Sequence, residues 1–215
     1  MVGIISFRKQ KKIGEAGTNP LMALKDQIIH EALRLYSLKG FLGTTIDDIL
    51  RATHSSKGGF YNHFKSKEDL FHHVLKEARK IWRERNLTGL TEHSGPIDNI
   101  KLFLENFRDF YLKDSENFPG GCIFITLLVE LKDQNPDLAE EITKGFTGMQ
   151  GMIKRYLDEA MKEGELKEDV DIDAMAEMIF HGMLGAALTY NSGVPGENGD
   201  KAINYIIDYI RKTER

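Results

Sequence analysis

The sequence predicts an all-α protein of about nine helices. Three observations support this fold class. Apolar residues recur three and four positions apart through most of the chain, the spacing of a helix with one buried face. No segment of useful length alternates apolar and polar residues as a half-buried strand does, and no internal repeat is present. Glycine and proline fall mainly between the periodic segments, where they end helices.

The composition is that of an ordinary globular protein, with 41% hydrophobic and 29% charged residues in a chain of 215. A single cysteine excludes a disulfide framework and favours a reducing compartment. No apolar run approaches the roughly 20 residues that a membrane span needs, and the opening MVGIISF is too short for a signal-peptide core. We therefore expect a cytoplasmic protein without a membrane partner.

The net charge of −4 hides an asymmetry along the chain. Residues 1–80 hold 14 lysines and arginines against 8 acidic residues, whereas residues 81–215 hold 15 against 25. A basic first part suits contact with phosphates, and an acidic second part suits a position away from them. Chance variation among solvated faces is the alternative interpretation.

The first helix is expected over residues 22–39, and Gly40 is a suitable residue to end it. The next stretch, residues 44–70, has the pattern of a helix-turn-helix followed by a connecting helix. Helices this short are marginal alone in water, so they must be held against their neighbours, as a recognition helix is. We expect a first short helix capped by Thr45, a turn at His54-Ser55, and a second short helix over 57–63 capped by Ser56.

The second short helix has one aromatic face. Phe60 and Phe64 lie four positions apart and should both face inward. Ser66 then caps a connecting helix with acidic residues in its first turn, which should reach about residue 88. The residues left for the outer face of the second short helix are Lys57, Gly59, Tyr61, Asn62 and His63.

This run resembles the DNA-binding domain of the TetR/AcrR family of bacterial transcriptional regulators. The resemblance covers roughly residues 22–82, with the helix-turn-helix motif at 45–64. The matching residues are Ile28, Ala32, Leu35, Tyr36, Lys39-Gly40-Phe41, Thr44-Thr45-Ile46, Ile49, Ser56-Lys57-Gly58, Tyr61, His63-Phe64-Lys65-Ser66-Lys67-Glu68 and Leu70. Two departures stand out: Gly59 where threonine is common, and His54-Ser55 where Gly-Val is usual.

The resemblance implies contacts with double-stranded DNA at an inverted-repeat operator. Lys57, Asn62 or His63 would supply the base contacts in the major groove. Tyr61 and Lys67 would bind phosphates, and Thr44 and Thr45 would present a helix N-terminus to the DNA backbone. The full set of expected DNA-binding residues is Thr44, Thr45, Ser56, Lys57, Gly59, Tyr61, Asn62, His63 and Lys67.

Residues 1–21 hold Arg8, Lys9, Lys11 and Lys12 and little that could pack, so we expect a flexible basic arm. Such an arm either reaches into a minor groove beside the helix-turn-helix or has no role. After a loop at 88–96, further helices are expected over 97–111, 122–131, 137–163, 173–191 and from about 200, with a turn at Pro195-Gly196.

The resemblance implies that residues 83–215 bind a small effector and form a dimer interface. An apolar or aromatic effector would suit the aromatic and methionine residues of these helices. The alternative is that these residues are ordinary core. The expected pocket residues are Phe103, Phe107, Tyr111, Cys122, Met149, Met152, Phe180 and Met183, with Tyr190 as a further candidate.

A second copy of the chain is the expected partner of the last two helices, because a palindromic operator requires a symmetric dimer. Small residues in the helix at 173–191 would let another helix approach closely, and isoleucines of the last helix would complete a four-helix interface. Close packing inside one subunit is the alternative. The expected interface residues are Gly182, Gly185, Ala186, Ile203, Ile206, Ile207 and Ile210.

Cys122 follows two glycines at the start of a helix, where the helix dipole would lower the pKa of its thiol. Sensing of oxidants or electrophiles is one hypothesis, as in some regulators of the family, and a buried structural thiol is the other. The adjacent pair His72-His73 points in two directions, and no cysteine–histidine cluster has zinc spacing. We expect no metal, no cofactor and no enzymatic activity.

Two functions remain. The first is a homodimeric repressor that a small apolar or aromatic effector releases from its operator. The second is a DNA-binding interaction protein of the same fold, whose acidic C-terminal domain docks a protein partner without an effector. An apolar cavity would favour the first, and a filled core with an exposed apolar patch would favour the second.

Overall fold

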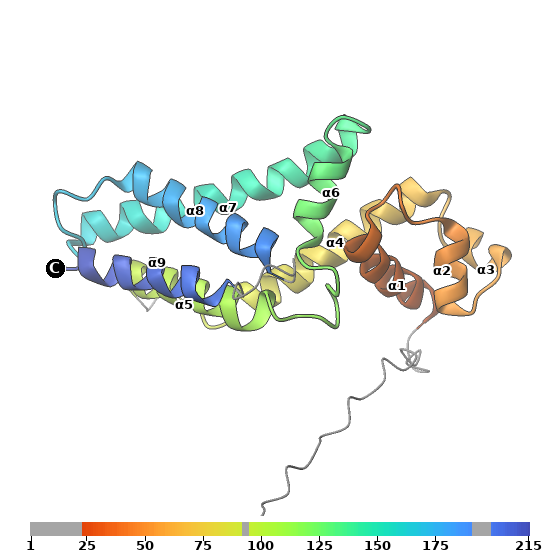
Figure 1. Ribbon diagram of the computed structural model, residues 1–215, viewed down its shortest axis with the longest axis horizontal. Coiled ribbons are helices and arrows are strands. Elements are labelled where there is room, and N and C mark those ends of the chain that lie inside the picture. Colours follow the sequence, from red (N-terminus) through yellow and green to blue (C-terminus); the bar gives the residue numbers. More distant parts are fainter. Residues whose placement is uncertain (1–22, 92–94, 191–198) are drawn as a thin grey trace, which may run out of the picture.

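The computed structural model describes residues 23–91, 95–190 and 199–215 and confirms the all-α fold (Figure 1). In these residues the only β pairing is an isolated bridge between Leu166 and Glu214. The elements in chain order are α1 (Leu24–Lys39), α2 (Ile46–Thr53), α3 (Lys57–Tyr61), α4 (Lys67–Asn86), α5 (Pro96–Asn106), the π-helical turn η1 (Phe107–Tyr111), α6 (Ile123–Leu131), α7 (Pro136–Glu163), α8 (Ile172–Thr189) and α9 (Asp200–Thr213).

The short helices α1, α2 and α3 gather at one end of the molecule, and α4 runs from them to the larger helical part (Figure 1). Aromatic rings fill the small core of this end. The ring centroids of Tyr36 and Phe41 lie 5.6 Å apart, and those of Phe41 and Phe71 lie 5.2 Å apart. Phe60 and Phe64 are buried, as their spacing predicted. Aromatic packing therefore joins α1 and the loop after it to α4, and the buried rings of Phe60 and Phe64 anchor the α3 segment.

Two helices differ from the sequence prediction. The helix predicted over 57–63 ends at Tyr61, because Gly58 and Gly59 are poor helix formers. After Tyr61 the chain tightens into a turn, in which the His63 N–H donates to the Phe60 carbonyl. The helix predicted over 97–111 widens into η1 after Asn106, which side-chain periodicity does not reveal. The predicted arm at 1–21 and the turn at Pro195-Gly196 lie outside the described residues.

The C-terminal part is built around α7, which packs against α5, α6 and α8, while α8 packs against α9. The long helix predicted over 137–163 is confirmed: Asn135 caps its start, and Gly164 ends it in the left-handed conformation at φ 76°. None of the described helices is both long enough and apolar enough to cross a membrane.

The two parts meet where α6 packs on α1. The Glu130 carboxylate accepts the backbone N–H groups of Phe41 at 2.6 Å and Leu42 at 3.0 Å, in the loop between α1 and α2. Ser37 Oγ accepts the N–H of Gly120 at 2.9 Å. A Cβ at Gly120 would fall 2.1 Å from the Ser37 carbonyl oxygen, so only glycine permits this approach. The end of α1 and the loop that leads into the helix-turn-helix are thus tied to α6 and to the loop before it.

Candidate functional site

The caps predicted for the helix-turn-helix are confirmed. Thr45 Oγ1 accepts the N–H of Asp48 at 3.1 Å, and the Asp48 carboxylate accepts the N–H of Thr45 at 3.0 Å, which completes a capping box. The bond from the Thr45 N–H lowers the pKa of Asp48, since it favours the charged carboxylate. His54 turns the chain in the left-handed conformation, with φ 51°. Local hydrogen bonds therefore define both ends of α2.

The helix α3 presents a polar face to solvent. Ser56 caps it by accepting the N–H of Gly59 at 3.1 Å. Tyr61 is 54% exposed even though its neighbour Phe60 is fully buried. Four of the predicted outer residues are exposed and polar, as a DNA-facing helix requires: Lys57, Tyr61, Asn62 and His63.

Gly59 lies at the edge of this face and is half-buried against α1. A Cβ added to it would lie 3.2 Å from Leu24 Cδ2, which is a tight contact. Glycine at this position therefore lets α3 approach α1 closely, a role that its predicted place on the outer face did not suggest.

Two predicted DNA-binding residues take structural roles. Thr44 is a correction: its side chain is fully buried, and its hydroxyl donates to the Gly40 carbonyl at 2.7 Å, so it cannot reach a phosphate. Lys67 Nζ donates to the carbonyls of Phe41 at 3.0 Å and Thr44 at 3.1 Å and lies 4.2 Å from the centroid of the Phe41 ring. Lys67 thus holds the loop that precedes α2.

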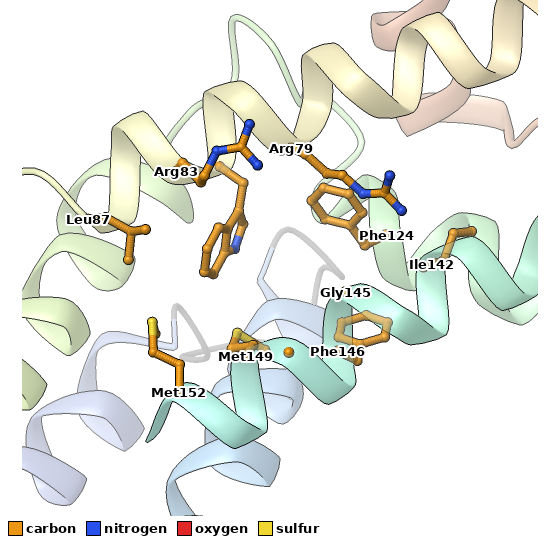
Figure 2. Close-up of a pocket in the computed structure, with 11 residues that line it drawn as sticks. Arg79, Arg83, Leu87, Phe124, Ile142, Gly145, Phe146, Met149 and Met152 are labelled. Carbon is orange, nitrogen blue, oxygen red and sulfur yellow. The ribbon is translucent and has the colours of Figure 1, made fainter. Parts of the chain in front are cut away.

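A pocket of about 230 Å³ lies between α4, α6 and α7 (Figure 2). Figure 2 shows Arg79 and Arg83 on α4 along one wall, with Phe146 and Met149 on α7 across from them. The pocket thus lies between α4, which runs from the helix-turn-helix end, and two helices of the C-terminal part, α6 and α7. The residues that line it are Arg79, Trp82, Arg83, Leu87, Phe124, Ile142, Gly145, Phe146, Gly148, Met149 and Met152.

Only Met149 and Met152 of the eight predicted pocket residues line this pocket. Phe103, Phe107 and Met183 are buried core residues, and these three predictions were wrong. Phe180 is also buried, with its ring against Phe146. Periodicity identifies the apolar face of a helix but not which part of that face meets a gap.

Tyr111 and Cys122 lie in a separate crevice of about 10 Å³, together with Tyr190, which leaves no room for a ligand. The Tyr111 hydroxyl donates to Cys122 Sγ at 3.2 Å. Burial raises the pKa of the Cys122 thiol, whereas the helix-dipole argument predicted that it would fall. The thiol is therefore in its less reactive form, and the structure favours the structural interpretation of Cys122.

The sequence prediction missed the contribution of α4 to the pocket. The sequence pattern gave no sign that Trp82 and the two arginines near it line a pocket. The glycines of α7 were the available clue. Gly145 and Gly148 interrupt a 28-residue helix, where glycine is unfavourable, and both line the pocket.

The predicted dimer interface also needs correction. Ile203, Ile206, Ile207 and Ile210 are buried inside the subunit, where α9 packs on α8 and α5. A Cβ at Gly182 would lie 2.4 Å from Ile206 Cδ1, so this glycine serves packing within the chain, and Ala186 is buried as well. Gly185 is exposed. The apolar side chains that α8 and α9 leave exposed are Met178, Leu188, Tyr205 and Tyr209.

The fold and the exposed polar recognition helix define a DNA-binding transcriptional regulator, and comparison with known proteins identifies its family. Residues 28–74 match the family described as bacterial regulatory proteins of the tetR family, and residues 96–192 match the tetracyclin repressor-like C-terminal domain. The chain belongs to the TetR family of transcriptional regulators.

Individual relatives agree with this assignment. An uncharacterised helix-turn-helix regulator of Lactococcus lactis is 30% identical over 134 residues, which cover 62% of this chain and 67% of the relative. The negative regulator IcaR of the Staphylococcus aureus biofilm operon is 29% identical over 56% of this chain and 68% of its own length. A TetR regulator from Chloroflexus aurantiacus is 30% identical, with a TM-score of 0.79 over 89% of this chain and 96% of that structure.

Proposed function

We propose that this regulator is a homodimeric repressor that leaves an inverted-repeat operator when a small effector occupies the pocket between α4 and α7. One observation carries the proposal. Helix α4 begins at Lys67, just after the helix-turn-helix, and continues without a break to the pocket wall at Arg79, Trp82 and Arg83. A ligand in the pocket therefore contacts the same rigid element that holds the DNA-binding end.

On the DNA side, α3 enters the major groove, where Lys57, Asn62 and His63 contact base edges. Tyr61 and the exposed start of α2 at Thr45 bind phosphates, which set the register. Lys67 adds a phosphate contact with its remaining donor, since an ammonium has three N–H groups and two are used internally. Two such helices in a dimer read half-sites about 34–36 Å apart.

The dimer forms through the exposed faces of α8 and α9. Tyr205 is 73% exposed and Leu188 is 63% exposed, and large apolar side chains gain stability when a second copy covers them. Gly185 has no atom within 4 Å of a Cβ built on it, so a partner helix can approach there. Repression is supported by the relative IcaR, which is named a negative regulator.

Effector binding is transmitted by two helices that reach both regions. Helix α6 carries Phe124 in the pocket wall and Glu130 against the loop at Phe41 and Leu42. A shift of α6 or α4 on ligand binding therefore moves the helix-turn-helix and changes the spacing of the two α3 helices. The corresponding coupling free energy is about 1–3 kcal/mol, as in other allosteric proteins.

The interaction-protein alternative is favoured by a different feature, an apolar groove of about 440 Å³ between α6, α7 and α8. Val129, which is 65% exposed, lines this groove. A protein partner seated there would bind without filling the pocket beside α4. Substitution Val129→Glu would then abolish partner binding while it left operator binding unchanged.

The first test is selection of bound sequences from random duplex DNA by the purified protein at two salt concentrations. Enrichment of one inverted repeat is expected. Recovery of no motif, together with a steep loss of binding at high salt, would show electrostatic attachment only and overturn the proposal.

Tyr61→Ala tests the division of roles on α3. It is expected to weaken binding to all sequences by about tenfold, because a phosphate contact carries no sequence information. The dimer should remain intact in sedimentation. A loss confined to one base position would assign Tyr61 to base recognition instead.

A further inference from the structure

The pocket between α4 and α7 is lined by both apolar and positively charged side chains. Most of the side chains that line it are apolar, among them Trp82, Phe146 and Met149. Two guanidinium groups stand on the α4 wall, and no acidic residue lines the pocket. A purely apolar ligand would form an ion pair with neither guanidinium group, whereas a ligand with one anionic end would use both kinds of surface.

The two arginines are one helical turn apart and lie along one wall (Figure 2). An N–H of Arg79 donates to the backbone carbonyl of Glu141 at 2.6 Å, which anchors this side chain at the pocket edge without neutralising its charge. Within the described part of the chain, no carboxylate forms an ion pair with either arginine. The Arg83 guanidinium therefore stays available for a ligand.

The opposite wall, on α7, has glycine at two positions. A Cβ built on Gly145 or Gly148 meets no atom within 4 Å, so packing inside the chain does not require glycine at these positions. Alanine would stabilise the helix more than glycine does at each position. Both glycines line the pocket, and the space that they leave is space for a ligand.

We propose that the pocket binds an amphipathic carboxylate. Its anionic group pairs with Arg83 and Arg79, and its apolar body lies between Trp82 and the α7 wall at Gly145, Phe146 and Met149. This inference rests on the proposed effector function and gives that effector a chemical class. A planar guanidinium matches a carboxylate through paired hydrogen bonds.

The volume sets the size of the apolar body. A cavity of roughly 150 Å³ suffices for benzene. The pocket, at about 230 Å³, therefore takes one ring with a short chain, or a medium-length acyl chain. Larger ligands would have to extend out of the pocket.

Three probes with the same body separate charge from apolar contact: 4-phenylbutyrate, 4-phenylbutan-1-ol and 4-phenylbutylamine. Trp82 is the only tryptophan of the chain and lines the pocket, so tryptophan fluorescence of the full-length protein reports on this site alone. The carboxylate is expected to bind at least about tenfold more tightly than the alcohol, and the amine most weakly.

Arg83→Gln tests the proposed contact. It is expected to weaken 4-phenylbutyrate binding by about tenfold and to leave the alcohol unchanged, which a general loss of structure would not do. Lys80→Gln is the matched control, because Lys80 is an exposed cation on α4 that does not line the pocket. It should leave the affinities of all three probes unchanged.

The outcomes separate this inference from the proposed function. Equal binding of acid and alcohol, binding of none of the probes, or equal effects of Arg83→Gln on both would overturn the anionic ligand. If the alcohol nevertheless releases selected operator DNA, the effector function stands with an uncharged ligand. If the acid binds in the pocket but leaves operator affinity unchanged, the result supports the anion site and contradicts the proposed release mechanism.

Discussion

The helix-turn-helix and the pocket are built in opposite ways. In the first, each functional element is defined by residues close in sequence: Thr45 with Asp48, and Ser56 with Gly59. In the second, the walls come from α4, α6 and α7, and Arg79 and Met149 lie seventy positions apart in the chain. The comparison shows that local hydrogen bonds define where the helices of the helix-turn-helix begin, whereas the pocket depends on what distant helices leave unfilled.

The largest expected effect comes from the core beneath the DNA-reading surface. Phe60→Ala should destabilise the protein by about 3–5 kcal/mol and abolish DNA binding, because it leaves a large cavity under a five-residue helix. Urea unfolding measures this loss. Phe110→Ala is the control, because Phe110 is 56% exposed and should change stability little. Similar losses for both would show that α3 does not depend on its aromatic anchor.

The junction between the two regions should give the next largest effect. Glu130→Ala removes the acceptor of two backbone N–H groups and should cost about 1.5–3 kcal/mol of stability. It should also reduce the effect of a pocket ligand on operator affinity. Leu128→Ala on the same helix controls for general disturbance of α6. Unchanged coupling in the Glu130 variant would exclude α6 as a route between the regions.

On the pocket side, Gly145→Ala should raise stability by about 1 kcal/mol while it weakens 4-phenylbutyrate binding, because the added methyl group occupies ligand space. Thermal unfolding and tryptophan fluorescence measure the two effects. Gly151→Ala is the matched control: its Cβ also meets no atom within 4 Å, but Gly151 does not line the pocket. It should stabilise equally without loss of binding.

The smallest effect concerns the capping box and its pH dependence. The pKa of Asp48 is lower in the folded protein than its ordinary value of 3.8. Its carboxylate therefore stabilises the fold above about pH 4, and this contribution is lost as the pH falls through the folded-state pKa. The stability difference between wild type and Asp48→Asn should shrink on acidification from neutral pH to about pH 2. A constant difference would contradict the role of the charged carboxylate.

Most of the fold could be predicted from the sequence, since helix periodicity and caps are local properties. Thr45, Ser56 and Ser66 cap helices as expected. The exposed positions of Lys57, Tyr61, Asn62 and His63 followed from the same pattern, whereas their contact with DNA was implied by the resemblance to the TetR family. Thr44 turned inward to Gly40 because its hydroxyl finds a carbonyl there. The sequence pattern does not show whether the Thr44 side chain bonds this carbonyl or faces the DNA-binding surface.

By itself, then, the sequence determined the family through its motifs. It also determined most of the helices and the exposed polar positions of the α3 segment, because helix periodicity and caps depend on residues a few positions apart. Only the tertiary structure decided which apolar residues became core and which became pocket. In the sequence, Phe103 and Met149 are both large apolar residues on the apolar face of a helix. In the structure, Phe103 is buried in the core, whereas Met149 faces the gap between α4 and α7. Whether a side chain meets another helix or a gap depends on the positions of helices that are distant in the chain, and no local pattern records those positions.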